Sequence, residues 1–239
     1  MTSHQLVRVE VSGHRGELIL DRPQQKNALT GPLVQQLLLG LNRLIAEDNC
    51  HVIVIRGEGG AFCAGVDVKA FFAEEKPAWV ASFADDWLAF HAALYCCPKP
   101  VVGALQRFAI AGGSALAFSC DFLVVGKSAF IHVAEVELGM AAPINVAWLA
   151  LKHSMAKALQ WVVLGERHYG EELVQLGLAS RCVEDHEVLD QARAMADRLA
   201  GFKPAAVQGL KCAVAAGYAL DREPAAFSAL VARIKAAQA

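Results

Sequence analysis

Two short stretches decide the fold: Ala-Phe-Cys-Ala-Gly-Val-Asp-Val-Lys at residues 61–69, and Ala-Ile-Ala-Gly-Gly-Ser-Ala at residues 109–115. Each places a small, glycine-containing turn after an apolar segment that is typical of a buried strand. Small residues let a ligand approach the backbone closely, and a glycine pair entering a helix leaves amide hydrogens free at the positive end of the helix dipole. Both turns therefore suit a negatively charged group, although the same composition also fits two ordinary tight turns.

The segments around these stretches alternate between strands and helices. Residues 7–11 and 17–20 predict a β-hairpin because apolar and polar side chains alternate on both sides of a turn. Helical spacing of apolar residues predicts a helix from the N-cap Thr30 to Ile45 and a second helix over 78–95. A short apolar helix is predicted to open at Gly112 and Gly113. Buried strands are predicted at 52–55, 101–105 and 122–125.

After Pro143 the pattern becomes almost wholly helical, and only residues 180–183 are typical of a strand. Apolar residues at helical spacing predict helices over 145–151, 156–164, 171–176, 186–199, 205–215 and 224–236. The chain has no Gly/Ser/Pro-rich linker and no repeat of fixed period. The sequence therefore predicts an α/β core over residues 1–185, followed by a helical C-terminal region over residues 186–239.

Composition excludes several classes of function. The 239 residues are 55% hydrophobic and 19% charged with a net charge of −2, which is typical of a globular enzyme and gives no basic surface for nucleic acid. Residues 1–10 lack the apolar core of a signal peptide, and the most apolar stretch, 109–118, is too short to span a bilayer. Seven cysteines without C-x-x-C or Cys/His spacing indicate reduced thiols and no metal site. We therefore expect a cytoplasmic protein that binds neither nucleic acid nor membrane.

The first stretch resembles the signature A-F-x-A-G-x-D-x-K of the crotonase, or enoyl-CoA hydratase/isomerase, family. The second resembles the family's K-P-V segment followed by its glycine pair, read here from Lys99-Pro100-Val101 to Gly112-Gly113 and ending in Cys120-Asp121. Other segments are similar to the family's first CoA-contacting loop and to its later helical segment, and the resemblance covers about residues 5–215. These further segments are Leu20-Asp21-Arg22-Pro23, Asn27-Ala28-Leu29, Leu164-Gly165-Glu166 and Gly177-Leu178-Ala179.

This resemblance implies a crotonase-like α/β fold, a spiral of ββα turns with a helical C-terminal trimerisation region. It implies a homotrimer or a dimer of trimers that binds an acyl-CoA thioester and needs no cofactor, since coenzyme A is part of the substrate. The backbone amides of Val66 and Gly112 would form an oxyanion hole for the thioester oxygen. The resemblance also implies contacts with substrate or CoA from Arg22, Lys26, Ala28, Ala64, Gly65, Asp67, Val68, Lys69 and Gly113. Asp67 could instead cap its own loop.

Family hydratases carry two glutamates beside the thioester, and this chain departs from that pattern. The first position falls on Ala115 and the second on Glu135. Hydration is best served by two carboxylates, whereas moving a double bond from the 3 to the 2 position needs one base. The segment Gly139-Met140-Ala141-Ala142-Pro143 also resembles the Δ3,Δ2-enoyl-CoA isomerase branch. The sequence therefore favours an isomerase acting on a medium or long acyl chain, with Glu135 as its catalytic base.

Several alternatives stay open at this point. The chain could be an enoyl-CoA hydratase of reduced activity, or a catalytically silent acyl-CoA-binding homologue in which Glu135 points away from the thioester. Glu137 is a spare candidate for the base, and His132 is more typical of a packed histidine. Arg107 stands where the family usually has glycine, either near the acyl pocket or at a subunit contact. The acyl-chain length would depend on how Phe71, Phe72, Phe83, Trp87 and Trp148 fold over the pocket.

Overall fold

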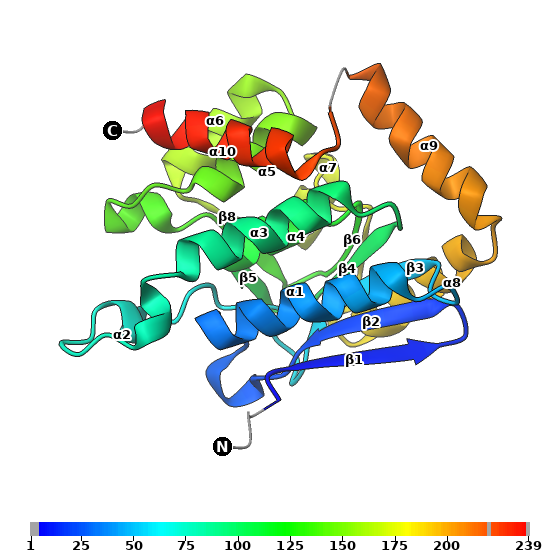
Figure 1. The fold of residues 1–239 in the computed structure, drawn as a ribbon, viewed down its shortest axis with the longest axis horizontal. Helices are drawn as coiled ribbons and strands as arrows, with labels where there is room; N and C mark the ends of the chain where they lie inside the picture. Colours follow the sequence, from blue (N-terminus) through cyan, green and yellow to red (C-terminus); the bar gives the residue numbers. More distant parts are fainter. Residues whose placement is uncertain (1–4, 219–220, 238–239) are drawn as a thin grey trace.

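A computed structural model describes residues 5–218 and 221–237, and a six-stranded sheet forms its centre (Figure 1). The predicted hairpin is confirmed, because β1 (Val7–Ser12) pairs antiparallel with β2 (Arg15–Leu20). All other neighbours in this sheet are parallel, in the order β1-β2-β3-β4-β6-β9. These strands are β3 (Val52–Gly57), β4 (Val101–Leu105), β6 (Phe122–Gly126) and β9 (Arg181–Val183).

A second sheet of three strands was not expected from the sequence. It contains β5 (Phe108–Ile110), β7 (Phe130–His132) and β8 (Arg167–Tyr169), in the order β5-β7-β8. β5 and β7 are parallel, with Ile110 opposite His132, so their carboxyl ends lie next to each other. Strands of three residues show no usable alternation of apolar and polar side chains, which is why the pattern missed them.

The predicted helices form, with shifted ends. The helix expected over 78–95 begins at Phe83, because residues 78–80 close a separate 3-10 turn after Pro77. Thr30 stands at the N-cap of the first helix, but its side chain makes no capping hydrogen bond. The helices are α1 (Gly31–Ala46), α2 (Val68–Phe71), α3 (Phe83–Cys96), α4 (Gly112–Ser119), α5 (Pro143–Lys152), α6 (Met155–Leu164), α7 (Gly170–Gln175), α8 (Val188–Ala200), α9 (Pro204–Gly217) and α10 (Pro224–Ala237). Four 3-10 turns accompany them: η1 (Pro23–Gln25), η2 (Ala78–Val80), η3 (Glu135–Leu138) and η4 (Asp185–Glu187).

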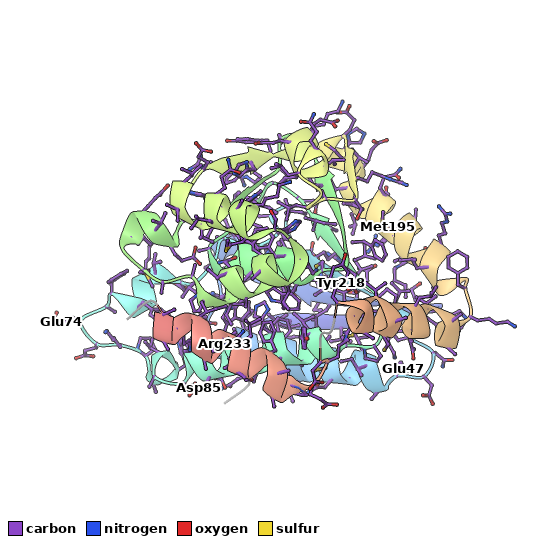
Figure 2. The ribbon with its side chains drawn as sticks, turned by 90° about the horizontal axis from the view of Figure 1, so that it is seen from above. Glu47, Glu74, Asp85, Met195, Tyr218 and Arg233 are labelled. Carbon is purple, nitrogen blue, oxygen red and sulfur yellow. The ribbon has the colours of Figure 1, made fainter. Side chains whose placement is uncertain are left out.

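Helices cover both faces of the six-stranded sheet. On one face α1 buries its apolar stripe, including Leu33, Leu37 and Leu41, in a core that it shares with α3, α4, α5 and α10. On the other face α8 packs alanines against β3, β4 and β6. Helix α9 stands to one side of the body (Figure 1), and the loop around Glu74 lies at the periphery (Figure 2). The division at residue 185 stays a prediction, and residues 1–4, 219–220 and 238–239 of the two predicted regions lie outside the described part.

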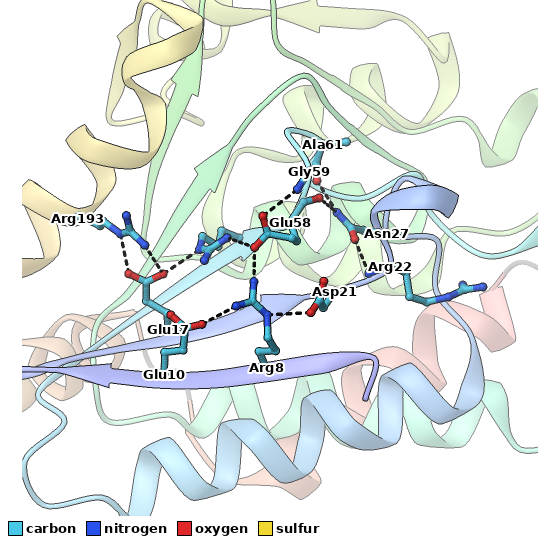
Figure 3. Close-up of polar contacts among 11 residues, drawn as sticks. Arg8, Glu10, Glu17, Asp21, Arg22, Asn27, Glu58, Gly59, Ala61 and Arg193 are labelled. Carbon is cyan, nitrogen blue, oxygen red and sulfur yellow. Dashed lines mark hydrogen bonds and ion pairs between the residues drawn. The ribbon is translucent and has the colours of Figure 1, made fainter. Parts of the chain in front are cut away.

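A buried carboxylate fastens α8 to the sheet. Glu17 of β2 is 3% exposed and accepts hydrogen bonds from Arg56 of β3 at 2.8 Å and from Arg193 of α8 at 2.7 and 3.0 Å. Figure 3 shows how this cluster continues through Glu58 and Arg8 to Asp21. Burial alone would raise the pKa of Glu17, but the hydrogen bonds and charges of the two arginines outweigh burial and lower it to about 2.

We expect Glu17→Gln to lower the free energy of unfolding by roughly 3 kcal/mol, because it leaves the arginines without their buried counter-charge. Urea unfolding at neutral pH measures this. Since the pKa of Glu17 is lower in the folded chain, its contribution is present above about pH 4.5 and is lost as the pH falls towards 2. The control is Glu184→Gln, whose ion pair with Lys127 is exposed and screened by solvent, so its loss should change stability much less. Equal losses in the two variants would contradict this prediction.

Candidate active site

The turn after β3 lies between the loop before α1 and the second sheet. Cys63 forms a parallel bridge with Ala109 of β5, and Val66 forms one with Leu29. The Leu29 amide donates to the Gly65 carbonyl at 2.7 Å, and the Asp67 amide donates to the Leu29 carbonyl at 2.9 Å. The donors in these two bonds are the Leu29 and Asp67 amides. The Val66 amide takes no part in them.

Glycines allow the two turns to touch backbone against backbone. A Cβ atom on Gly65 would lie 2.6 Å from the Ile110 carbonyl oxygen, and one on Gly113 would lie 2.5 Å from the Cys63 carbonyl oxygen. Both distances are shorter than van der Waals contact, and Gly65 also has a φ of +83°, which favours glycine. The sequence predicted the approach of a ligand at these glycines, and that stays a prediction; in the structure Gly65 and Gly113 allow the two turns to pack against each other.

The Val66 side chain lies close to Gly112 at this contact. Ala111 has a φ of +51°, and its amide donates to the His132 carbonyl at 2.9 Å, so the chain turns sharply into α4 at Gly112. The position of a Cβ on Gly112 lies 3.7 Å from Cγ2 of Val66. Since Gly112 is the first residue of α4, its amide has no acceptor within the helix. The Gly112 amide is therefore available to an acceptor outside the helix.

Glu135 lies near the start of α4 because β5 and β7 are parallel neighbours. Gly112 follows the carboxyl end of β5, and Glu135 begins η3 just after β7. The Asn145 side chain of α5 joins the two, since its Nδ2 donates to Oε1 of Glu135 at 2.9 Å and to the Ala111 carbonyl at 3.2 Å. Oε2 of Glu135 is buried and has no hydrogen-bond partner among the residues that the structure describes. Burial raises the pKa of Glu135 to about 7, although the residue's own amide and Asn145 lower it.

The other candidate groups near Glu135 in the sequence, Glu137 and His132, contact each other and not Glu135. Glu137 is exposed and its Oε1 lies 3.1 Å from Nε2 of His132, which also lies 2.9 Å from the Gly165 carbonyl oxygen. His132 is therefore held in a structural contact. Ala115 is fully buried in α4, so the first of the two glutamate positions of family hydratases carries no acid here.

The residues expected to contact CoA lie on neighbouring loops. They differ in whether their side chains already have partners within the protein. Arg22 donates to the Ala28 carbonyl at 2.6 Å and lies 3.5 Å from Asp67, so its cation already has protein partners. Ala64 is tied to this loop, since its amide donates to the Lys26 carbonyl at 3.1 Å. The side chains of Lys26, Val68 and Lys69 are exposed. Among the described residues, no group of three His, Cys, Asp or Glu side chains is arranged to hold a metal ion.

The buried Asn27 holds the loop that carries Arg22 and Lys26. Its side chain donates to the Glu58 carbonyl at 3.0 Å and to the Ala61 carbonyl at 2.7 Å, and it accepts from the Arg22 amide at 2.9 Å (Figure 3). Asn27 and Lys26 both have a positive φ, so the loop is sharply bent between η1 and Leu29. This loop is thereby joined to the start of the 61–67 turn.

The aromatic residues expected to line the acyl pocket divide into two groups. Trp87 of α3 borders the turn at Gly112, since its Cζ2 lies 3.8 Å from a Cβ position on Gly112, and it stacks on Phe83, which contacts Phe71. Phe72 is 73% exposed, and Trp148 donates to Nδ1 of His91 at 2.9 Å. Arg107 is exposed, has a φ of +60°, and stacks over the Phe108 ring.

Sequence reasoning missed Asn145, which is buried at the start of α5. An asparagine two residues after a proline is ordinary at a helix start, so no pattern distinguishes it. A buried asparagine in a mainly apolar helix could have raised the question of its partner, because buried polar groups are normally hydrogen-bonded.

Comparison with known proteins identifies the family to which the chain is related. The family described as enoyl-CoA hydratase/isomerase matches residues 16–237. The "Probable enoyl-CoA hydratase" of Rhizobium meliloti (strain 1021) is 30% identical over 207 residues, which cover 86% of this chain and 79% of that protein. The "Carnitinyl-CoA dehydratase" of Proteus mirabilis (strain HI4320) is 32% identical over 82% of this chain and 74% of its own length.

The fold agrees with solved structures as well. The structure "Enoyl-CoA Hydrates Subunit I" from Geobacillus kaustophilus HTA426 superposes with a TM-score of 0.81 at 27% identity, covering 95% of this chain and 90% of that one. The predicted α/β crotonase-like fold is therefore confirmed, whereas none of these names singles out the isomerase branch. The chain belongs to the enoyl-CoA hydratase/isomerase family, also called the crotonase family, and is an enzyme of that family.

Proposed function

We propose that this enzyme moves the double bond of a 3-enoyl-CoA to the 2 position, with Glu135 as its single base. The observation that carries the proposal is a buried carboxyl whose Oε2 has no partner among the described residues, joined through Asn145 to the turn that precedes Gly112. A substrate that develops negative charge on its thioester oxygen and gives up a neighbouring proton fits this arrangement.

The proposed reaction uses these groups in turn. The amides of Val66 and Gly112 donate to the thioester oxygen, and each donor aimed at developing charge contributes about 3 to 4 kcal/mol. Oε2 of Glu135 takes one proton from C2, which leaves a dienolate with its charge on the thioester oxygen. The same proton is then delivered to C4, and the double bond moves to the 2 position. Base and substrate both end in their original charge state, so no cofactor or second acid is required.

The surroundings of Glu135 support a one-base reaction. Ala115 offers no proton, and Glu137 is directed to His132. We also propose that the exposed Lys26 and Lys69 pair with CoA phosphates, while Arg22, Ala28, Ala64, Gly65, Asp67, Val68 and Gly113 shape the loops around the thioester. The enzyme would act in the cytoplasm as a homotrimer or a dimer of trimers. Within the described residues, every helix is too short or too polar to cross a membrane.

One observation favours hydration as a second candidate activity. Oδ1 of Asn145 is buried without a donor, as is Oε2 of Glu135, and both belong to one hydrogen-bonded pair. A single water molecule could donate to both oxygens and be activated for addition to a 2-enoyl-CoA. A silent acyl-CoA-binding protein is the third reading, and it predicts no turnover in either assay.

The test is to give the purified protein 3-hexenoyl-CoA and crotonyl-CoA in parallel. We expect double-bond migration to exceed hydration, followed by the absorbance of the conjugated thioester and by chromatography of the products. In D2O a single shielded base should return part of the original proton, so deuterium at C4 should be incomplete. Dominant hydration of crotonyl-CoA would replace the isomerase proposal with the hydratase.

The pH dependence of the reaction follows from the pKa of Glu135, which burial raises from 4.5 to about 7. The ionised carboxylate is the active form, so kcat/KM should fall about tenfold for each pH unit below 7 and level off above it. Rates measured from about pH 5 to pH 9 with saturating and limiting substrate give this profile. A solvent-exposed glutamate would instead have a pKa near 4.5, and the rate would begin to fall only near that pH. A rate that stays constant down to pH 5 would therefore contradict the prediction.

A further inference from the structure

We propose that Asn145 is a positioning residue, which holds Oε1 of Glu135 and so makes Oε2 the oxygen that carries the proton. This inference rests on the proposed function of Glu135, and it adds a role for a residue that the sequence patterns did not single out. It also identifies which of the two carboxyl oxygens reacts.

The first support is that both hydrogens of the Asn145 amide are used at the site. One hydrogen bond goes to Oε1 of Glu135 at 2.9 Å and the other to the Ala111 carbonyl at 3.2 Å. Ala111 is the residue immediately before the proposed oxyanion donor Gly112. One side chain therefore connects the base to the oxyanion turn and holds them in a common frame.

The second support is that the two oxygens of Glu135 differ. Oε1 accepts from Asn145, so protonation there would compete with an existing hydrogen bond. Oε2 is buried and has no partner among the described residues. A proton taken from substrate meets no competing donor at Oε2, which makes this the reactive oxygen.

The third support is that Asn145 is itself held rigidly. It is 2% exposed, and its α5 neighbour Trp148, one turn further on, is buried and donates to Nδ1 of His91 in α3 at 2.9 Å. Residues three apart lie on one face of a helix, so this bond also fixes the rotation of α5 that presents Asn145 to Glu135. A side chain with a fixed rotamer on a helix is suited to positioning a catalytic group.

Charged groups on the neighbouring elements do not compete for Glu135. His132 of β7 and Glu137 of η3 contact each other, and Lys152 of α5 donates to the Cys120 carbonyl at 2.7 Å. His91 of α3 contacts Trp148, and Lys157 of α6 donates to the Leu176 carbonyl at 2.9 Å. The amide of Asn145 is thus the side-chain hydrogen bond that lowers the pKa of Glu135 against its burial.

The experiment compares Asn145→Leu, which keeps the volume without hydrogen bonds, with Asn145→Asp, which adds a negative charge at the same place. In Asn145→Leu we expect kcat for isomerisation to fall about tenfold with little change in KM, and the acidic limb to move to higher pH. Asn145→Asp should move this limb further, because two neighbouring carboxyls do not ionise together easily. The control Asn42→Leu changes an exposed asparagine of α1 and should leave the profile in place.

A readout without turnover separates this inference from the proposed function. The carboxyl carbon of Glu135 is followed by 13C NMR and assigned with Glu135→Gln, and its pKa should rise in Asn145→Leu. An unchanged pKa and an unchanged limb would overturn the positioning role, even if the variant lost stability. A protein that does not isomerise but shows the raised pKa would reject the proposed reaction and keep the positioning of Glu135 by Asn145.

Discussion

Replacement of Glu135 by Gln should reduce double-bond migration by about 10²- to 10⁴-fold, the usual effect of removing a general base. Gln keeps the shape and can still accept from Asn145 through its Oε1, but its amide nitrogen cannot take a proton from C2. The loss should appear in kcat with KM nearly unchanged, because the carboxylate acts in proton transfer. Steady-state kinetics on 3-hexenoyl-CoA measures it.

The matched control for this experiment is Glu137→Gln, which changes the exposed carboxyl two residues further along the same turn. It should retain the wild-type rate. Burial raises the pKa of Glu135 to about 7, so its ionisation costs the folded chain stability as the pH rises from 4.5 through 7. Glu135→Gln removes this cost and should have a Tm at pH 8 that is equal to or above that of the wild type. If Glu137→Gln lost as much rate as Glu135→Gln, the assignment of Glu135 as the single base would be wrong.

Replacement of Gly65 by Ala should lower kcat by about 10²- to 10³-fold, the effect of losing one oxyanion donor. The new Cβ would lie 2.6 Å from the Ile110 carbonyl oxygen, and a φ of +83° is strained for alanine. The contact involves backbone on both sides, so the turn must shift and carry the neighbouring Val66 amide with it. Kinetics on 3-hexenoyl-CoA, together with the affinity for a non-reactive acyl-CoA, separates the rate effect from binding.

Gly60→Ala is the control for strain alone, because Gly60 has a φ of +75° but nothing within 4 Å of its Cβ position. It should lose about 1 kcal/mol of stability and keep its activity. If Gly65→Ala retained full activity at a temperature where it is folded, the Val66 amide would not be an oxyanion donor.

Local patterns were sufficient for the large elements. The alternation before Leu20 predicted the hairpin, and the leucines of α1 predicted a helix with one buried face, since the period of apolar residues reflects which side meets the core. The beginning of α3 was predicted five residues too early, because Trp79 and Phe83 are both apolar and only the fold decides that Trp79 belongs to a separate 3-10 turn.

The site itself was predicted only as separate pieces. The motif residues at 61–69 and 109–115 do meet, and Glu135 does lie near them, although their roles stay predictions that the proposed experiments test. The sequence offered both Glu135 and Glu137 as the base. In the structure they have different partners, since Glu135 accepts from Asn145 and Glu137 contacts His132. The sequence does not distinguish the two glutamates as candidates for the base, because they lie two residues apart in the same short segment.

By itself, then, the sequence determined the order of the longer strands and helices, the glycine turns and the absence of an acid at Ala115. These depend on neighbouring residues, whose conformational preferences and hydrophobic periods are local. The tertiary structure alone decided that β5 and β7 pair in parallel, which brings Gly112 and Glu135 together, and that Asn145 joins them from α5. Such contacts join residues far apart in the chain, and burial, which raises the pKa of Glu135, exists only once those segments have packed.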